Sequence, residues 1–524
     1  MRPAVVVMLA LTLALALALA AAPESIGLAL AASDQNDHPD LPRVSGASPF
    51  TADCNGPAFP ISAAYVNAEV EPYVAINPKN PNNLIAVYQE DRYPGDGANG
   101  VLAAASFDGG KSWQAPELRY QPQFSRCAGG NETRGADLEM ASDPWIDFGP
   151  DGTAYFAAVA FNKSNPDTAE LVSVSTTGGR TWDSPIAVIR ENVADVSDER
   201  PAVTADPTRA HTAYLVWARH RSAPASSAAG AVYFSRTTDG GKSWSTARAI
   251  YEAPVGMQTS ANQVVVMPNG ELVNVLNELG LDTGSRHPRH DRIAVIRSTD
   301  GGLTWSKPAV LADSSVAGVT DPHTGAMIRV GDSFTDIAVD PRPGTHTIYA
   351  VWGDSRFTRS GTQQIALTKS TDGGRTWAEP VAVSTDQGAQ AFVPAVAVND
   401  RGDVAVTFYS FATGKSPSPA LMTQYWITLS QDDGQTWTTA QQVSRQPFDL
   451  RTAPFNGGFF LGEYQGLAGA GQSFVAVAAF TNGRSLDNRT DIFACTTTLG
   501  DRASPLQAGP AGDTSNRHSC DPRR

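Results

Sequence analysis

Acidic residues and arginines recur at matching places in the sequence. Glu71, Asp143 and Glu463 each open a segment of alternating apolar residues, and Arg200 opens another. Further along such segments, four arginines each follow an aromatic residue by four positions: Arg92, Arg221, Arg356 and Arg484. Guanidinium groups bind carboxylates through two parallel hydrogen bonds, and carboxyl groups can exchange protons with a substrate. These residue types therefore suit the binding and hydrolysis of an acidic ligand.

The same residues have simpler uses. Asp91, Asp291 and Asp354 lie close to arginines in the sequence, so these arginines can be paired within the protein. The acidic residues can also ring a channel that holds water or a structural Ca²⁺ ion. We expect no metal in the site itself and no other cofactor, because the sequence lacks the spacings typical of zinc and nucleotide binding.

The segments that carry these residues have the pattern of β-hairpins. Each contains two apolar runs with a period of two residues, joined by a turn rich in Pro, Gly, Asn and Asp. Seven such segments occur: Glu71–Arg92, Asp143–Phe161, Arg200–Arg221, Ala261–Leu279, Phe334–Arg356, Val393–Phe411 and Glu463–Arg484. No segment of useful length after the N-terminal apolar run has a helical period.

A second motif follows six of the seven hairpins. Its copies are Ser106–Trp113, Ser175–Trp182, Thr237–Trp244, Ser298–Trp305, Ser370–Trp377 and Ser430–Trp437. In the pattern S/T-x-D-G-G-x-S/T-W, the Asp accepts backbone hydrogen bonds within a turn and the glycines supply positive φ angles. The Trp is expected to pack beneath the turn. Thr177 replaces the Asp in the second copy, which we expect to weaken that turn without abolishing it.

We interpret the chain as all-β, a β-propeller of four-stranded antiparallel blades. Seven hairpins favour seven blades, while six motif copies leave six blades as the alternative. The run Thr490–Leu499 gives the last hairpin a third strand, and the segment Phe59–Val66 could supply its fourth strand and close the ring. The expected organisation is a signal peptide at 1–32, an N-terminal extension at 33–57, the propeller at 58–500 and a C-terminal tail at 501–524.

The repeated motif is similar to the Asp-box of the BNR-repeat β-propellers, the superfamily of the sialidases (exo-α-sialidases, neuraminidases). The resemblance covers nearly the whole chain after the N-terminal apolar run, and it implies a ligand site on the face opposite the Asp-boxes. The sialidase active site combines an Asp acid/base with a Tyr nucleophile assisted by Glu. By this resemblance Asp96 is the acid/base, with Arg92 beside it. The segment GEYQGLA nominates Tyr464 as the nucleophile and Glu463 as its proton acceptor.

The arginine triad that binds the substrate carboxylate in sialidases is not matched. Arginine is absent from the three places where the family pattern has it: Val70–Pro72, Asn277 and the region of Met422. In a sialidase of this sequence, the carboxylate would have to be bound by Arg200, Arg356 or arginines within residues 286–292.

The composition and the first residues favour an exported protein. The 524-residue chain carries a formal net charge of −14 at pH 7, so it has no overall electrostatic attraction to nucleic acid or anionic lipid. The apolar run Ala4–Ala22 and the small residues after it are typical of a signal peptide, with an uncleaved anchor as the alternative.

The even number of cysteines favours two disulfides, whose pairing the sequence leaves open: Cys54, Cys127, Cys495 and Cys520. We expect a monomer that is secreted or held at the cell surface by bacterial-type export, without membrane contact after signal cleavage.

Three functions remain open. The first is a sialidase-like glycoside hydrolase that acts on the terminal acidic sugars of glycans. The second is a non-catalytic propeller that binds glycans or proteins. The third is a polysaccharide hydrolase that uses a pair of carboxylates drawn from Glu71, Asp143 and Glu463. In each case the residues expected around the ligand are the same: Glu71, Asp143, Arg92, Arg200, Arg221, Arg356 and Arg484.

Overall fold

The computed structural model describes residues 38–55, 63–221, 229–280, 291–331, 334–414, 420–483 and 485–499, and the backbone of 517–518. All of them belong to the unit Asp37–Arg524. They are almost entirely β, with helical structure only in four short 3-10 turns: Ala52–Asn55, Leu118–Tyr120, Glu132–Arg134 and Leu450–Thr452. No helix in this part of the chain is long and apolar enough to cross a membrane. The expected signal peptide, and most of the expected tail, lie outside the described residues.

Most strands fall into antiparallel groups that follow one another along the chain. The groups are β1 (Val70–Ile76), β2 (Leu84–Arg92) and β3 (Ala98–Ser106); β4 (Met140–Phe148), β5 (Ala154–Phe161), β6 (Asp167–Ser175) and β7 (Ile186–Asn192); β8 (Val196–Ala205), β9 (Ala213–Arg221), β10 (Ala231–Thr237) and β11 (Arg248–Glu252); β12 (Met257–Val266), β13 (Leu272–Gly280), β14 (Asp291–Ser298) and β15 (Ala309–Ser314); β18 (Asp336–Val339), β19 (Ile348–Asp354), β20 (Gln364–Ser370) and β21 (Val381–Ala382); β22 (Ala389–Val398), β23 (Val404–Ala412), β24 (Met422–Ser430) and β25 (Gln441–Gln442); and β28 (Gly466–Ala470), β29 (Ser473–Thr481), β30 (Thr490–Thr498) and β31 (Arg517–His518). The first two groups are joined into one seven-stranded sheet by the pairing of Ala98 in β3 with Ala141 in β4. The predicted all-β class is confirmed, and four-stranded antiparallel sheets are present.

The remaining strands are short. A small sheet contains β16 (Val319–Thr320), β17 (Met327–Arg329) and β27 (Phe459–Phe460), and β26 (Phe448–Asp449) pairs with β24. The pairing of β17 with β27 is parallel and joins segments that are far apart in the sequence. Through this pairing, Arg329 comes to lie near the segment that leads into β28.

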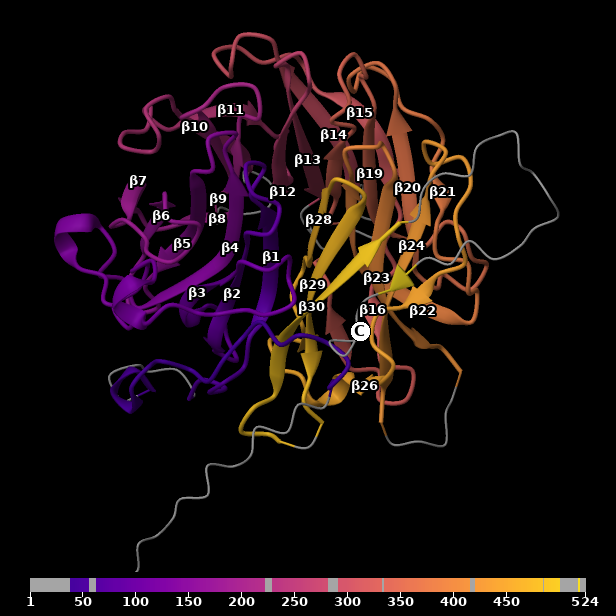
Figure 1. The fold of residues 1–524 in the computed structure, drawn as a ribbon, viewed down its shortest axis with the longest axis horizontal. Coiled ribbons are helices and arrows are strands. Elements are labelled where there is room, and N and C mark those ends of the chain that lie inside the picture. The colour runs from indigo at the N-terminus through magenta and orange to yellow at the C-terminus, as the bar shows by residue number, and fades with distance from the viewer. Residues whose placement is uncertain are drawn as a thin grey trace, which may run out of the picture. The chain divides into compact units, whose positions relative to one another are not determined.

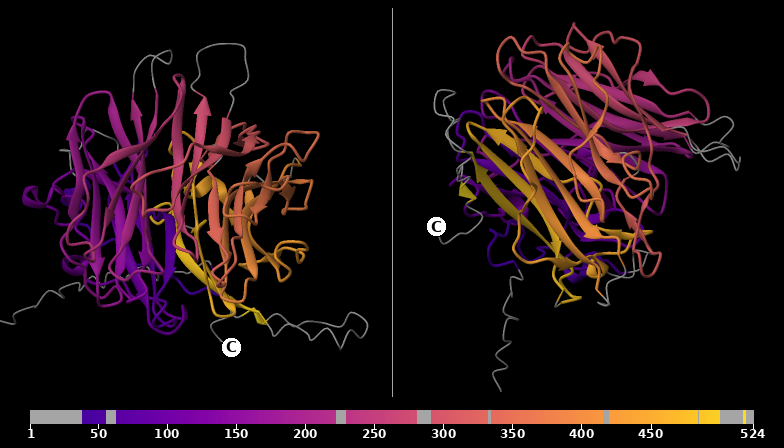
Figure 2. Two further views of the ribbon diagram at one scale, coloured as in Figure 1. Left: turned by 90° about the horizontal axis from the view of Figure 1, so that it is seen from above. Right: turned by 90° about the vertical axis from the view of Figure 1, so that its right-hand side faces the viewer.

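The first strands of successive groups lie side by side. β1 packs beside β4, β4 beside β8, β8 beside β12, β12 beside β18, β18 beside β22 and β22 beside β28. β28 in turn packs against β1. Figure 1 shows the same order in colour, with the yellow strands β28 and β29 next to the indigo strand β1, and Figure 2 gives two further views. The residues that open these strands are thereby gathered from all parts of the chain.

The Asp-boxes form the predicted turns. In the first copy, the hydroxyl of Ser106 accepts the backbone N–H of Gly110 at 2.9 Å. Asp108 Oδ1 accepts the backbone N–H of Ser112 at 3.0 Å, and the Trp113 ring nitrogen donates to the carbonyl of Gly110 at 3.2 Å. The φ angle of Gly110 is +88°, a conformation that a residue with a side chain rarely adopts. The motif therefore fixes its own turn through local hydrogen bonds.

The copy without aspartate keeps this turn. The hydroxyl of Thr177 accepts the backbone N–H of Thr181 at 2.9 Å, in the place of the missing carboxylate. The boxes also pack against the turn between the first two strands of a group, since the N–H of Gly240 donates to the carbonyl of His211 at 2.9 Å. That turn follows Ala205 at the end of β8, whereas Arg200 lies near the middle of this strand. The Asp-boxes therefore lie at the turn end of the strands, away from the predicted site residues.

The last group receives strands from both ends of the chain. Arg43 forms an antiparallel bridge with Phe493 of β30, and the N–H of Val44 donates to the carbonyl of Ile492 at 2.7 Å. The prediction had assigned this role to Phe59–Val66, but Tyr65 instead bridges to Arg92, and residues 56–62 lie outside the described part of the chain.

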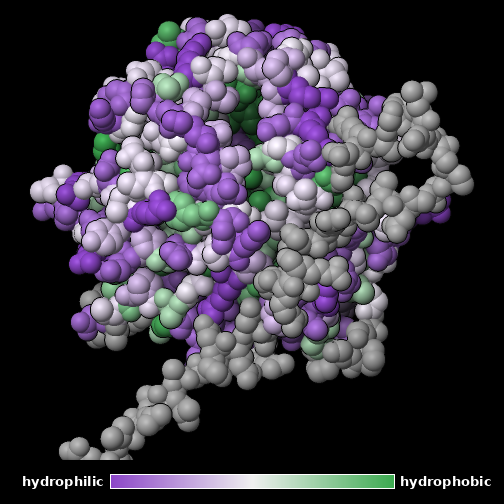
Figure 3. Space-filling view, in the orientation of Figure 1, coloured by the Kyte–Doolittle hydropathy of each residue, from purple (hydrophilic) through white to green (hydrophobic). Residues whose placement is uncertain are grey.

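Disulfides and apolar packing hold the groups together. Cys54 and Cys127 form a disulfide, and Cys495 is also disulfide-bonded. Between neighbouring groups, large side chains such as Trp217 and Trp352 are fully buried. Figure 3 shows polar residues over most of one face, with apolar residues visible mainly in its hollows.

Candidate functional site

Five of the first strands contain a bulge at the same position. The register of pairing shifts there in β1, β4, β8, β12 and β22. Each bulge holds a non-glycine residue with a φ angle between 49° and 57°: Glu71, Asp143, Arg200, Ala261 and Val393. Such backbone strain costs about 1–3 kcal/mol per residue and is concentrated at functional sites, where bulges re-aim side chains. Three of the five residues are charged residues that the sequence had singled out.

A cavity opens beside two of these bulge residues, Asp143 and Arg200, and we call it the site pocket. Its volume is about 260 Å³, and its walls include Asp96, Asp143, Arg200, Arg329 and Glu463. Asp96 comes from the loop between β2 and β3, Arg329 ends β17, and Glu463 precedes β28. The pocket thus collects charged side chains from five separate segments.

The carboxylate of Glu463 is held between two arginines. Arg329 Nε donates to Oε1 at 2.8 Å, and Arg200 donates to Oε2 through one terminal nitrogen. The other terminal nitrogen of Arg200 donates to the hydroxyl of Ser260. Burial by itself would raise the pKa of Glu463, but attraction to Arg200 and then to Arg329 outweighs it, so the pKa is lowered. Glu463 is therefore ionised at neutral pH.

Glu71 lies beside Glu463, but its pKa is shifted in the opposite direction. Its side chain is buried, and Oε1 accepts the backbone N–H of Glu463 at 3.2 Å. Burial, with repulsion from Asp143 and Glu463, raises the pKa of Glu71 to about 8. Gln89 donates to the other carboxyl oxygen. Two glutamates in contact thus have pKa values displaced in opposite directions.

Asp143 continues this network into the site pocket. Ser142 donates to Oδ1 at 2.8 Å, and the backbone N–H of Arg200 donates to Oδ2 at 3.0 Å. Gln89 links Glu71 to the hydroxyl of Ser142, to which it donates at 3.0 Å. Burial raises the pKa of Asp143 despite the attraction of Arg200. The pocket therefore has a carboxyl group that holds its proton more tightly than an ordinary aspartate does.

Asp96 and Arg92 lie together, as the resemblance to sialidases implied. Arg92 Nη2 is 3.5 Å from Asp96 Oδ1, and Lys163 Nζ is 3.9 Å from Oδ2. The Arg92 side chain is 2% exposed and its guanidinium lies 5.0 Å from the ring centre of Phe460, whereas the Asp96 side chain is 47% exposed. Asp96 is therefore at the rim of the site pocket, where it can reach solvent.

Tyr464 occupies a different position. Its side chain is buried, and its hydroxyl donates to the carbonyl of Pro144 at 3.1 Å. It packs against Trp145 and Phe334 and lines a small enclosure that also touches Asp143 and Arg200. Burial raises the pKa of Tyr464 well above its ordinary value. The phenol is thus next to the site pocket but is not among the residues that line it.

Two other arginines named from the sequence, Arg356 and Arg221, are not among the residues that line the site pocket. Arg356 pairs with Asp354 at 2.8 Å and donates to the carbonyl of Asp313. Arg221 ends β9 and is exposed, and Arg484 lies outside the described residues. Arg329 was not predicted, because it belongs to no hairpin and no repeated pattern marks it. Among the described residues there is no cluster of His, Cys, Asp and Glu suited to a metal ion.

Comparison with known proteins identifies the repeats. Residues 150–335 match the BNR repeat-like domain. A sialidase of Bacteroides fragilis (strain YCH46) is 33% identical over 108 residues, which is 18% of this chain and 19% of that protein. The chain thus spans about a fifth of the length of this curated relative. Together with the six Asp-boxes, these matches support the resemblance of the chain to the BNR/Asp-box repeat superfamily, that of the sialidases.

Solved structures that are similar to this chain have lower sequence identity to it. The Hadza microbial sialidase Hz136 is 17% identical with a TM-score of 0.43, covering 68% of this chain and 66% of its own. An α-L-arabinanase of Penicillium chrysogenum is 12% identical with a TM-score of 0.45, covering 87% of this chain and 97% of its own.

Proposed function

We propose that the seven strand groups are the blades of a closed seven-bladed β-propeller. The support is the succession of first strands, which runs from β1 to β28 and returns to β1. The isolated bridge between Arg43 and Phe493 also ties the N-terminal side of the chain to the last group. The site pocket then lies at one end of the propeller axis, as expected for this architecture.

We further propose that the protein is a secreted glycoside hydrolase that removes a terminal acidic sugar in the site pocket. The observation that carries this proposal is the pair of carboxyl groups with opposed pKa shifts, Asp143 raised and Glu463 lowered, in the wall of one pocket. Such a pair is the usual assignment of a general acid and an ionised carboxylate. The volume of about 260 Å³ suits one sugar unit rather than a chain of them.

The roles follow from the protonation states. Asp143 would protonate the glycosidic oxygen, while Glu463 would take a proton from the attacking water or attack the sugar directly. Arg329 is the candidate partner of the sugar carboxylate. Only its Nε bonds Glu463 among the described contacts, and its side chain is 32% exposed. Asp96, at the rim, would exchange protons with solvent.

A second mechanism keeps the same substrate. Tyr464 would be the nucleophile, Glu463 its proton acceptor and Asp96 the acid/base, which requires the Tyr464 hydroxyl to leave the carbonyl of Pro144. The two mechanisms differ in one variant. Tyr464→Phe abolishes hydrolysis in the tyrosine mechanism, but only moderately lowers it in the carboxylate mechanism.

The test is hydrolysis of fluorogenic sialosides, uronides and neutral arabinosides by the purified protein. Asp143→Asn is expected to lower kcat by about 10²–10⁴-fold. Arg329→Gln is expected to raise KM for the acidic substrates only. Arg356→Gln is the matched control, since Arg356 is paired with Asp354 away from the pocket.

Two results would count against this proposal. Full activity of Asp143→Asn would remove the acid role from Asp143. Binding on a glycan array without turnover of any substrate would favour the alternative of a non-catalytic propeller.

We also propose that the protein acts outside the cytoplasm as a monomer. The disulfide between Cys54 and Cys127 supports this, because such bonds persist in oxidising compartments. The proposed partner is a glycan.

A further inference from the structure

A second and larger cavity lies at the other end of the first strands, and we call it the proline cavity. Its volume is about 700 Å³. Along β4, Asp143 faces the site pocket, while Asp147 and Phe148 face the proline cavity. Trp145 lies on β4 between Asp143 and Asp147. Its ring stacks on that of Tyr73 from β1, with the centroids 3.7 Å apart. The two cavities share no lining residue.

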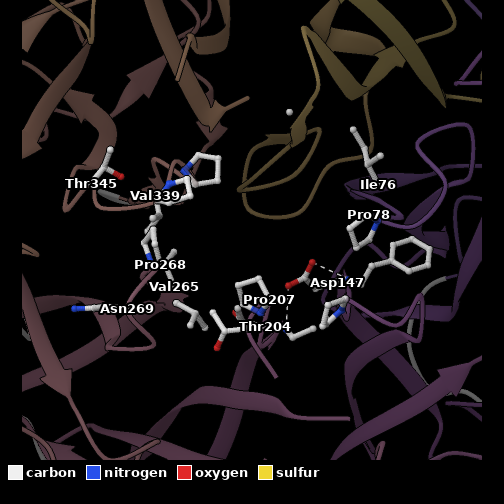
Figure 4. A pocket seen from close by; sticks show the side chains of 18 of the residues that line it. Ile76, Pro78, Asp147, Thr204, Pro207, Val265, Pro268, Asn269, Val339 and Thr345 are labelled. Carbon is white, nitrogen blue, oxygen red and sulfur yellow. Dashed lines mark hydrogen bonds between the residues drawn. The ribbon is translucent and has the colours of Figure 1, made fainter. Parts of the chain in front are cut away.

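Prolines surround the proline cavity in a repeated position. Each lies two residues after the final core residue of a first strand, in five successive groups: Pro78, Pro150, Pro207, Pro268 and Pro341. Figure 4 shows Pro78, Pro207 and Pro268 around the opening, together with Val265 and Val339. Proline has no N–H group, so the wall is apolar and offers no backbone donor at these five positions. Polar side chains complete the lining: Thr204, Thr208, Asn269, Thr345 and His346.

A single carboxyl group stands in this apolar wall. In Figure 4 the side chain of Asp147 points into the cavity, held by hydrogen bonds from the backbone N–H groups of Phe148 at 2.8 Å and Ala205 at 2.9 Å. No Lys or Arg among the described residues lines the cavity, and no described ion pair joins Asp147 to a cation. Burial raises the pKa of Asp147 to about 7. An apolar pocket with one such convergent polar group is a binding-site candidate.

We propose that the proline cavity binds an alkylammonium group, with Asp147 as the counter-ion and the proline wall around the alkyl chain. An ammonium group supplies the positive charge that no Lys or Arg of the lining provides, together with hydrogen-bond donors for the Asp147 carboxylate. The net charge of −14 favours a cationic ligand over an anionic one. The ligand site is independent of the proposed hydrolase site.

The test is calorimetric titration of the full chain with n-hexylammonium chloride, hexan-1-ol and sodium hexanoate. Hexylammonium is expected to bind at least about tenfold more tightly than hexanol, which corresponds to about 1.4 kcal/mol, and hexanoate not at all. Asp147→Asn is expected to remove this preference for the cation. Val339→Trp, which fills the cavity, is expected to remove binding of both hexylammonium and hexanol.

The matched control is Asp336→Asn. Asp336 is also a buried carboxyl whose pKa is raised by burial to about 7, and it accepts the backbone N–H of Val396 at 2.7 Å, but it does not line the cavity. This variant is expected to bind hexylammonium like the wild type. Equal binding of hexanol and hexylammonium, or unchanged binding by Asp147→Asn, would overturn the proposal.

A further arm identifies the source of the ammonium group. Nα-acetyl-lysine methylamide carries the same head group on a peptide backbone. Binding as tight as that of hexylammonium indicates a lysine side chain as the natural ligand, and clearly weaker binding indicates a free amine. Either result supports an alkylammonium site, whereas failure of both ligands to bind rejects it. Glycoside hydrolysis is measured separately, so loss of that activity does not bear on this proposal.

Discussion

Replacing Glu71 by glutamine should change how the stability of the protein depends on pH. Glu71 has a pKa raised from 4.5 to about 8 by burial and by its carboxylate neighbours. Between these values the folded protein holds a proton that the unfolded chain releases, so the free energy of unfolding falls as the pH rises. The stabilising contribution is complete below pH 4.5 and is lost as the pH passes through about 8. The amide introduced by Glu71→Gln has no such titration.

The magnitude follows from the size of the shift. Each pH unit within the window is worth about 1.4 kcal/mol, so wild type should lose about 4 kcal/mol relative to Glu71→Gln between pH 5 and pH 8. For a chain of 524 residues the entropy of unfolding is about 1.1 kcal/mol/K. The melting temperature of Glu71→Gln should therefore rise by roughly 4 °C relative to wild type across this range.

The assay is thermal melting of both proteins at pH 5, 6, 7 and 8, read as the difference between them. Any hydrogen bond that the amide makes poorly with Gln89 adds a constant offset and leaves the slope intact. Asp137→Asn is the control at a carboxyl whose pKa is lowered, by a hydrogen bond from Arg190, and whose charge is not among those that act on Glu71. Its difference from wild type should stay flat over this range. A flat difference for Glu71→Gln as well would refute the reasoning.

Two further predictions concern the scaffold. Gly302→Ala should lower the free energy of unfolding by about 2–4 kcal/mol, because an added Cβ would lie 2.3 Å from Phe234 Cζ at a φ of +85°. Gly318→Ala, at a φ of +78° with nothing within 4 Å, should cost only about 1 kcal/mol in the same urea titration. Cys54→Ser should cost about 4 kcal/mol by the chain-entropy relation, since the disulfide to Cys127 spans 73 residues. Adding reductant to the wild type should cost at least as much, because the disulfide of Cys495 is reduced as well.

The repeated elements of the fold were predictable because their signals are local. The Ser106–Trp113 turn is specified by hydrogen bonds between residues at most four positions apart, so its pattern is visible in the sequence. Alternating apolar residues likewise revealed the hairpins. The bridge from Arg43 to Phe493 of β30 was not predicted, because Pro42–Ser45 has no such pattern and is selected by contacts with residues far along the chain.

The site was predictable only in part for the same reason. Glu71, Asp143 and Arg200 were found because they occupy equivalent places in repeated hairpins, which the bulges then turn to one end of the strands. Arg329 lies outside the repeats, and only the parallel pairing of β17 with β27 brings it to Glu463. The burial of the Tyr464 hydroxyl against Pro144 depends on a contact between residues 320 positions apart.

The pairing of Pro42–Ser45 with β30 has a consequence for synthesis of the protein. The hydroxyl oxygen of Ser45 accepts the N–H of Ile492 at 3.0 Å, and this donor is made 447 residues later. The groups from β1 to β25 can pair locally as they leave the ribosome, but the last one is completed only with the earliest described segment. Until the two meet, each presents unpaired backbone that another nascent chain can capture. The yield of folded protein in a cell should therefore depend on how fast translation reaches β30. It should also depend on chaperones that cover Pro42–Ser45 until then.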